Sequence, residues 1–153
     1  MVRRREEEMT PETAFQLANG AAPVAWVAMM VAPRSKLARQ LLLSGAFVAF
    51  LSSAYALVIL THFDVAGADF TSLEGVAALL RDPWAMTAGW IHYLAFDLLA
   101  GILVTRKGLA IGIPRLWLLP CQLGCFMLGP VGILLFIGVS KARGNRWHDI
   151  GLN

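Results

Sequence analysis

The sequence predicts an all-α polytopic membrane protein with four transmembrane helices and a short amphipathic interfacial helix. Of its 153 residues, 58% are hydrophobic, and the mean hydropathy of +0.63 is far above that of a soluble domain of this length. Three segments carry no charged side chain over the roughly 20 residues that cross a hydrocarbon core, and a fourth carries only Asp97. A soluble bundle would need about as much polar helix surface to cover them, and too few residues remain. The segments are residues 14–32, 41–60, 116–139 and 84–104.

The first span is expected over residues 12–32 and the second over residues 40–61. Thr10 is a candidate N-cap, and the proline after it suits the first turn of a helix. The polar Asn19 and the helix-breaking Pro23 must face protein, water or a ligand, because lipid offers no hydrogen bonds to polar groups. The second span follows a short basic loop and carries small residues suited to close helix packing.

An interfacial helix is expected over residues 72–81 and the third span over residues 84–105. Thr71 and Glu74 match a capping box, and the apolar residues after them recur at helical spacing. We expect Gly108 to end the third span, because glycine readily adopts the left-handed conformation found after many helices.

The fourth span is expected over residues 115–139, after Pro114 restarts the chain. It contains an unusual density of helix breakers, among them Gly129 and Pro130. Close helix packing through glycines and a kink that faces a ligand both fit this pattern, and the two can hold together. The four spans and the interfacial helix are expected to form a single domain over residues 1–153.

The basic residues lie between the apolar segments. The net charge is +3, but the chain has no basic helix face or aromatic-interleaved basic run, so we expect no nucleic-acid binding. Lysine and arginine are divided almost equally between the two sides of the predicted bundle, although the loops after the first and third spans lack acids, which favours the cytoplasm for those loops. The acidic residues after Arg3–Arg5 do not fit a removable leader. We expect the protein to lie in the bacterial cytoplasmic membrane, surrounded by lipid. We also expect it to form a homo-oligomer or to join a membrane complex.

Two ionisable side chains lie deep in the third span. At about 1.5 Å per residue, His92 and Asp97 fall roughly 12 Å and 20 Å along a span of roughly 30 Å. An ionisable group at this depth usually faces the bundle interior and has a partner or a function. At about 100° per residue, the two groups lie on stripes about 140° apart. The stripe of Asp97 also contains Trp90, Tyr93 and Gly101, and that of His92 contains Phe96.

Two interpretations of these groups remain open. They are an acid/base pair that acts on an apolar substrate, or they are structural residues whose hydrogen bonds are satisfied by neighbouring helices. No metal site or cofactor is expected, because His92, Cys121 and Cys125 lack the paired-ligand spacings of metal sites. His62 and His148 are at helix ends and are interpreted as interfacial polar residues.

Several motifs together resemble one known family. They are the run over residues 82–97, the loop over residues 112–114, the stretch over residues 120–132, and two short motifs of the first span at residues 17–19 and 32–33. The chain is identified as a member of the abscisic-acid-deficient-four-like, or neoxanthin synthase-like, family. The resemblance implies a four-helix membrane protein, whose plant members are required to convert violaxanthin to neoxanthin.

The resemblance further implies an isomerase that acts on a carotenoid or another isoprenoid. In our hypothesis Asp97 is the base and His92 the acid, and Tyr93 or Asn19 orients the substrate oxygen. The alternative is a non-catalytic accessory subunit that holds a lipid or pigment in a membrane complex. The residues expected to contact a substrate are Asn19, Trp90, Phe96, Gly101, Gly129 and Pro130.

Overall fold

The computed structural model describes residues 9–62 and 68–145, and every regular element in these ranges is helical. The elements are α1 (Pro11–Val31), the π-helix η1 (Ala38–Leu42), α2 (Ala46–His62), α3 (Leu73–Leu79), α4 (Pro83–Ala110), α5 (Arg115–Leu128) and α6 (Pro130–Ala142). The all-helical fold class is confirmed, and three segments are long and apolar enough to cross a membrane: α1, Ala38–His62 and α4. Arg3–Arg5, Arg146 and His148 lie outside the described residues.

The first three spans lie close to their predicted positions. The Thr10 side chain accepts a hydrogen bond from the amide three residues on, at 3.2 Å, so the predicted N-cap of α1 is confirmed. α4 continues to Ala110, and the prediction that Gly108 ends it is wrong. Gly108 lies inside the helix because Leu118 packs against it: a Cβ there would lie 2.6 Å from the Leu118 Cδ1 atom. The glycine with a positive φ in this turn is Gly112, at 73°.

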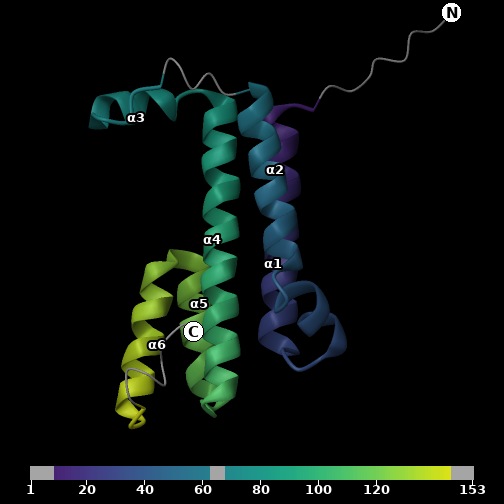
Figure 1. Ribbon diagram of the computed structural model, residues 1–153, viewed down its shortest axis with the longest axis vertical. Coiled ribbons are helices and arrows are strands. Elements are labelled where there is room, and N and C mark those ends of the chain that lie inside the picture. Colours follow the sequence, from purple (N-terminus) through teal and green to yellow (C-terminus); the bar gives the residue numbers. More distant parts are fainter. Residues whose placement is uncertain (1–8, 63–67, 146–153) are drawn as a thin grey trace, which may run out of the picture.

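α3 is a short helix that runs across the direction of the spans at one end of the bundle (Figure 1). Its N-cap is Ser72, whose hydroxyl accepts from the Gly75 amide at 3.0 Å, and not Thr71 as predicted. The Asp69 carboxylate accepts hydrogen bonds from the hydroxyls of both Thr71 and Ser72. These bonds form a turn before the helix, so that the helix begins after Ser72 and not after Thr71. None of the α3 residues is buried. Its direction fits an interfacial helix, and its depth in a membrane stays a prediction.

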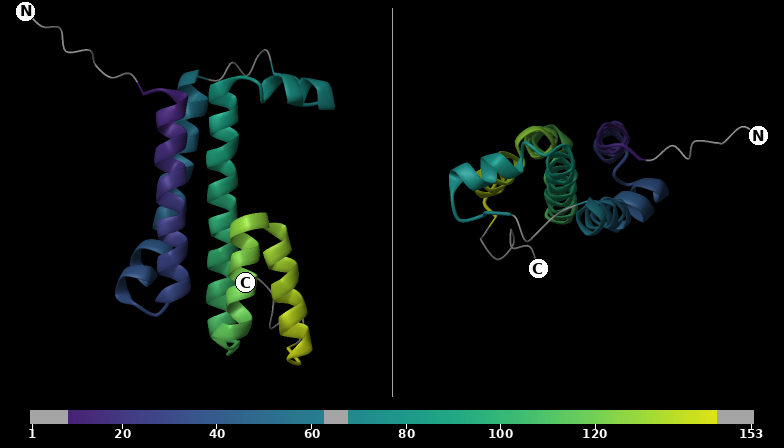
Figure 2. Two further views of the ribbon diagram at one scale, coloured as in Figure 1. Left: turned by 180° about the vertical axis from the view of Figure 1, so that it is seen from behind. Right: turned by 90° about the horizontal axis from the view of Figure 1, so that it is seen from above.

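The segment predicted as the fourth span is a helical hairpin. The prediction of a single helix over residues 115–139 is wrong, because α5 ends at Leu128 and α6 begins at Pro130. The residue between them, Gly129, has φ 36° and ψ −87°. Proline cannot donate the backbone hydrogen bond that would continue α5. Figures 1 and 2 show α6 running back beside α5, with the hairpin tip at mid-height of α4. With 14 residues, α5 is about 21 Å long, which is too short to cross a core of about 30 Å.

Two glycines allow the arms of the hairpin to pack closely. A Cβ on Gly132 would lie 2.1 Å from the Cys125 amide nitrogen and 2.5 Å from the Cys121 carbonyl oxygen. A Cβ on Gly124 would lie 2.8 Å from the Gly132 Cα atom. Because these neighbours are backbone atoms, only glycine permits this approach. The glycines that were predicted to mark close helix packing therefore do so within the hairpin.

The hairpin changes the distribution of charge between the two ends of the bundle. It returns the chain to the end where α1 and α4 finish (Figure 2), which we call the basic end. Among the described residues, Arg81 lies at the opposite end with all the acids except Asp97. The positive-inside rule therefore favours a cytoplasmic location for the basic end. The described bases of the basic end are Arg34, Lys36, Arg39, Arg106, Lys107, Arg115, Lys141 and Arg143.

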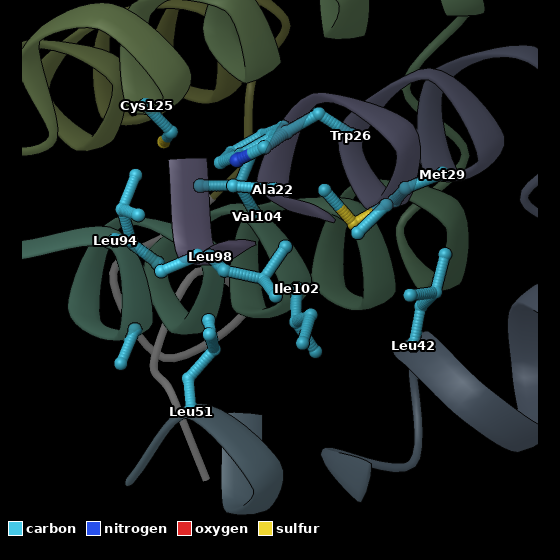
Figure 3. Packing of buried hydrophobic residues seen from close by; sticks show 14 of the residues in the cluster. Ala22, Trp26, Met29, Leu42, Leu51, Leu94, Leu98, Ile102, Val104 and Cys125 are labelled. Atoms are coloured by element: carbon cyan, nitrogen blue, oxygen red, sulfur yellow. The ribbon is translucent and has the colours of Figure 1, made fainter. Parts of the chain in front are cut away.

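α4 is the central helix and packs against α1, α2, α5 and α6. Figure 3 shows Trp26 and Met29 of α1 lying over Leu98 and Ile102 of α4 in the core. Outside this core the helices remain strongly apolar: Leu60, for example, is 83% exposed. An outer surface of this kind is suited to lipid.

Candidate functional site: a buried carboxyl at the hairpin tip

Asp97 lies in the middle of α4 and faces the tip of the α5–α6 hairpin. A Cβ placed on Gly129 would lie only 2.2 Å from the Asp97 Oδ1 atom, so the absence of a side chain at Gly129 makes room for the carboxyl group. The Asp97 residue is 6% exposed, and its Oδ2 atom is buried with no hydrogen-bond partner in the described part of the chain. Such a group is costly to bury, which makes Asp97 a candidate functional residue.

The backbone around the carboxyl group suits a negative charge. α6 begins at Pro130, beside Asp97, and the Gly132 amide of its first turn donates to the Gly129 carbonyl oxygen at 3.1 Å. The dipole of α6 is positive at this end. No side chain caps α6. Asp97 therefore lies near the positive end of the α6 dipole.

A cleft of about 250 Å³ borders the carboxyl group. Phe96 is 60% exposed and Leu99 36% exposed, so the cleft opens on the outer surface of the helices. The wall is apolar apart from Asp97, which is its one ionisable member. An apolar molecule that entered from lipid would meet a single carboxyl group there. The lining residues are Phe96, Asp97, Leu99, Ala100, Leu103, Gly129, Pro130 and Ile133.

Tyr93 fixes the position of the hairpin. Its hydroxyl donates to the Met127 carbonyl oxygen at 2.9 Å. This carbonyl belongs to the last turn of α5, where carbonyls have no partner within the helix. Tyr93, one turn before Asp97, thus anchors the hairpin tip to α4. The structure gives it this contact and leaves the predicted orienting role untested.

His92 does not line the cleft, although its ring contacts Phe96, which does. The histidine is exposed, stacks on Phe96 with ring centroids 4.5 Å apart, and lies 5.5 Å from the Tyr55 ring of α2. Asp97 is buried at the hairpin, and His92 is not among the residues that line its cleft. His92 and Asp97, the predicted acid and base, therefore lie in different surroundings.

Three further predicted residues serve contacts between α1 and α4. The Trp90 Nε1 atom donates to the Asn19 Oδ1 atom at 3.2 Å. Gly101 gives room to Trp26, because a Cβ there would lie 2.2 Å from the Trp26 Cη2 atom. The cleft includes Phe96, Gly129 and Pro130, and none of Asn19, Trp90 and Gly101. The structure thus divides the predicted substrate contacts into a cleft group and a packing group.

Two polar contacts were not predicted. Gln122 donates to the Thr105 hydroxyl at 2.7 Å, and both residues are buried between α5 and α4. Arg115 donates to the carbonyls of Met30 and Val31 and so joins the start of α5 to the end of α1. Gln122 could have been noticed as a polar residue within an apolar segment. The partner of Arg115 could not, because it depends on the packing of distant helices.

Comparison with known proteins gives one match. The family model described as ABA DEFICIENT 4-like matches residues 13–136, which include most of α1 and all of α2, α4 and the hairpin tip. No curated protein and no solved structure matches the chain. The match covers most of the sequence and agrees with the family resemblance drawn from the motifs. The chain therefore belongs to the ABA DEFICIENT 4-like family.

Proposed function

We propose that the protein binds a carotenoid-like isoprenoid at the cleft beside Asp97 and isomerises it, with Asp97 transferring the proton. The observation that carries the proposal is a buried carboxyl oxygen without a partner, next to an apolar cleft that opens on the outer surface. Family membership and the resemblance to proteins needed for neoxanthin formation support the substrate class. A cleft of about 250 Å³ would hold only part of such a molecule, and the remainder would lie among lipid chains.

The proposed reaction opens an epoxide without net oxidation or reduction. The Asp97 carboxylate removes a proton from a polyene carbon near the epoxide. The electron pair of that C–H bond forms the new double bond of an allene, and the adjacent C–O bond breaks onto oxygen. The carboxylic acid then returns its proton to this oxygen, which becomes a hydroxyl. The initial hypothesis made His92 the acid; because His92 does not line the cleft, we assign both transfers to Asp97.

The test is expression in a host that supplies epoxy-carotenoids, followed by chromatography of the pigments. Wild-type protein is expected to form an isomer of equal mass. Asp97→Asn should lower turnover by at least about 10²-fold, because it removes the acid/base group. Glu74→Gln removes an exposed acid of α3 and should have no effect, and His92→Ala should retain turnover. Unchanged pigments with folded wild-type protein would exclude the isomerase.

A second candidate function is that of a non-catalytic subunit that holds a lipid or pigment in a membrane complex. The observation that favours it is the cleft itself, which has only one ionisable residue in its lining. Under this function a pigment or lipid should co-purify with the protein and be lost from a Pro130→Leu variant, whose larger side chain would fill the cleft. No product should form with any epoxy-carotenoid. Turnover by the purified protein would rule this candidate out.

We place the protein in the bacterial cytoplasmic membrane, with its basic end in the cytoplasm. The charge difference between the two ends supports this orientation. A homo-oligomer or a partner protein in the membrane is part of the same proposal, and cross-linking in native membranes would detect it.

A further inference from the structure

A cavity of about 890 Å³ lies at the basic end of the bundle, away from Asp97. Three arginines line it, and each comes from a different segment. Arg34 lies in the loop after α1, Arg39 in the π-helix η1, and Arg106 in the last turns of α4. Leu43 and Leu109 add apolar walls, and Ser44 adds a hydroxyl. The fold thus brings together three cations that are far apart in the sequence.

These three guanidinium groups have no counter-charge within the described chain. Within residues 9–62 and 68–145 they make no side-chain hydrogen bond or ion pair with a protein group, and the basic end contains no aspartate or glutamate there. Arg115 provides a contrast, because its guanidinium group donates to backbone carbonyls at the end of α1. Like charges around one cavity repel one another unless an anion lies between them. The planar donors of arginine match phosphate oxygens especially well.

The local structure around Arg39 is also unusual. It lies in a π-helix of five residues, a rare conformation that occurs most often at functional sites. The helix is followed by a turn at Gly45, whose φ is 88°. Arg39 thus lines the cavity from a segment that departs from regular α-helix.

The surroundings of the cavity favour a lipid over a free anion. It lies at the ends of α1 and α4, where the headgroups of a membrane would be. The loop that carries Arg34 also borders a separate groove of about 530 Å³ along α1, lined almost entirely by apolar residues such as Val24 and Val27. This groove can accommodate an acyl chain. Anionic lipids are abundant at cytoplasmic membrane surfaces, and basic pockets between transmembrane helices bind their headgroups.

We propose that this arginine cavity binds the phosphate headgroup of an anionic phospholipid. The site is distinct from the Asp97 cleft and does not depend on the proposed isomerase. Wild-type protein in detergent, measured by native mass spectrometry, is expected to bind phosphatidylglycerol more tightly than zwitterionic phosphatidylcholine. Binding should weaken by about fivefold for each arginine replaced. It should also weaken at high salt, because exposed charges are screened.

The decisive variant is Arg34→Gln/Arg39→Gln/Arg106→Gln, with Arg143→Gln as the matched control. Arg143 is an exposed base of the same end that does not line the cavity. The triple variant should lose the preference for phosphatidylglycerol, whereas the control should bind within about twofold of wild type. If the triple variant does not fold, the three single variants replace it, each with an expected loss of about fivefold.

Two results would overturn the proposal. One is equal binding of phosphatidylglycerol by wild-type protein and the arginine variants. The other is inorganic phosphate that binds as tightly as phosphatidylglycerol and displaces it, because the site would then recognise a free anion and not a lipid.

Discussion

Replacing Gly132 by alanine is expected to open the α5–α6 hairpin. The new Cβ would lie 2.1 Å from the Cys125 amide nitrogen and 2.5 Å from the Cys121 carbonyl oxygen. Overpacking a tight site usually costs about 1–3 kcal/mol, and contacts with backbone atoms favour the upper end, about 3 kcal/mol. At 1.4 kcal/mol per factor of ten, the opened state should become about 100-fold more populated.

Thiol labelling measures this opening. Cys125 is buried beside Gly132 and has a free thiol, so a membrane-permeant reagent reaches it only when the hairpin opens. In a Cys121→Ser background, Gly132→Ala should raise the labelling rate by about 100-fold, because the rate follows the open population when opening and closing are fast.

Gly138→Ala is the matched control. Gly138 lies on the same helix, and a Cβ there would meet no atom within 4 Å. This variant should label at the wild-type rate or more slowly, because alanine favours a helix over glycine by about 1 kcal/mol. Equal labelling of both alanine variants, with unchanged helical content, would refute the close approach of α5 and α6.

Three further predictions concern the topology of the chain, the anchor of the hairpin tip and the turn before α3. In a cysteine-free background, single cysteines can be introduced at Ser35, Leu73 and Gly144. The cysteines at positions 35 and 144 should be labelled from the same side of a sealed membrane, and the cysteine at position 73 from the other side. If residues 115–139 formed a single span, position 144 would instead be labelled from the same side as position 73. Tyr93→Phe should lower the free energy of unfolding in detergent by about 1 kcal/mol, because it removes the donor to the Met127 carbonyl; an unchanged value would mean that this hydrogen bond does not anchor the tip. Hydrogen bonds from Ser72 and Thr71 lower the pKa of Asp69 from 3.8 to about 2, so the turn before α3 keeps its stabilisation above about pH 4 and loses it as the pH falls toward 2. An NMR titration of the Thr71 amide would show this transition, and its persistence in Asp69→Asn would contradict the assignment.

The sequence was sufficient to predict the first three spans because each is an apolar segment of membrane-spanning length. It also predicted the position of Asp97 within the third span, which depends only on the rise per residue along α4. It did not predict that the second span divides into η1 and α2 at Gly45. The hairpin could not be predicted from hydropathy, because one long apolar helix and two short antiparallel ones have the same average. Gly129 and Pro130 were recognised as helix breakers, but a break fits a kink as well as a reversal.

The surroundings of the candidate site depend on that reversal. Gly129 reaches Asp97 only because the chain turns back at mid-height of α4, and no local pattern records this contact. Helical spacing correctly separated His92 from Asp97, yet it could not show which side the hairpin would cover. The arginine cavity was missed for a similar reason: Arg34, Arg39 and Arg106 were interpreted only as loop charges.

The hairpin also gives the molecule different widths in the two leaflets of a bilayer. At the basic end, α5 and α6 add their volume to that of α1, α2 and α4, whereas above the hairpin tip α1, α2 and α4 are the long helices of the described residues (Figure 1). The protein therefore has the shape of a wedge. Lateral pressure in the leaflet of the basic end would therefore act on the hairpin directly.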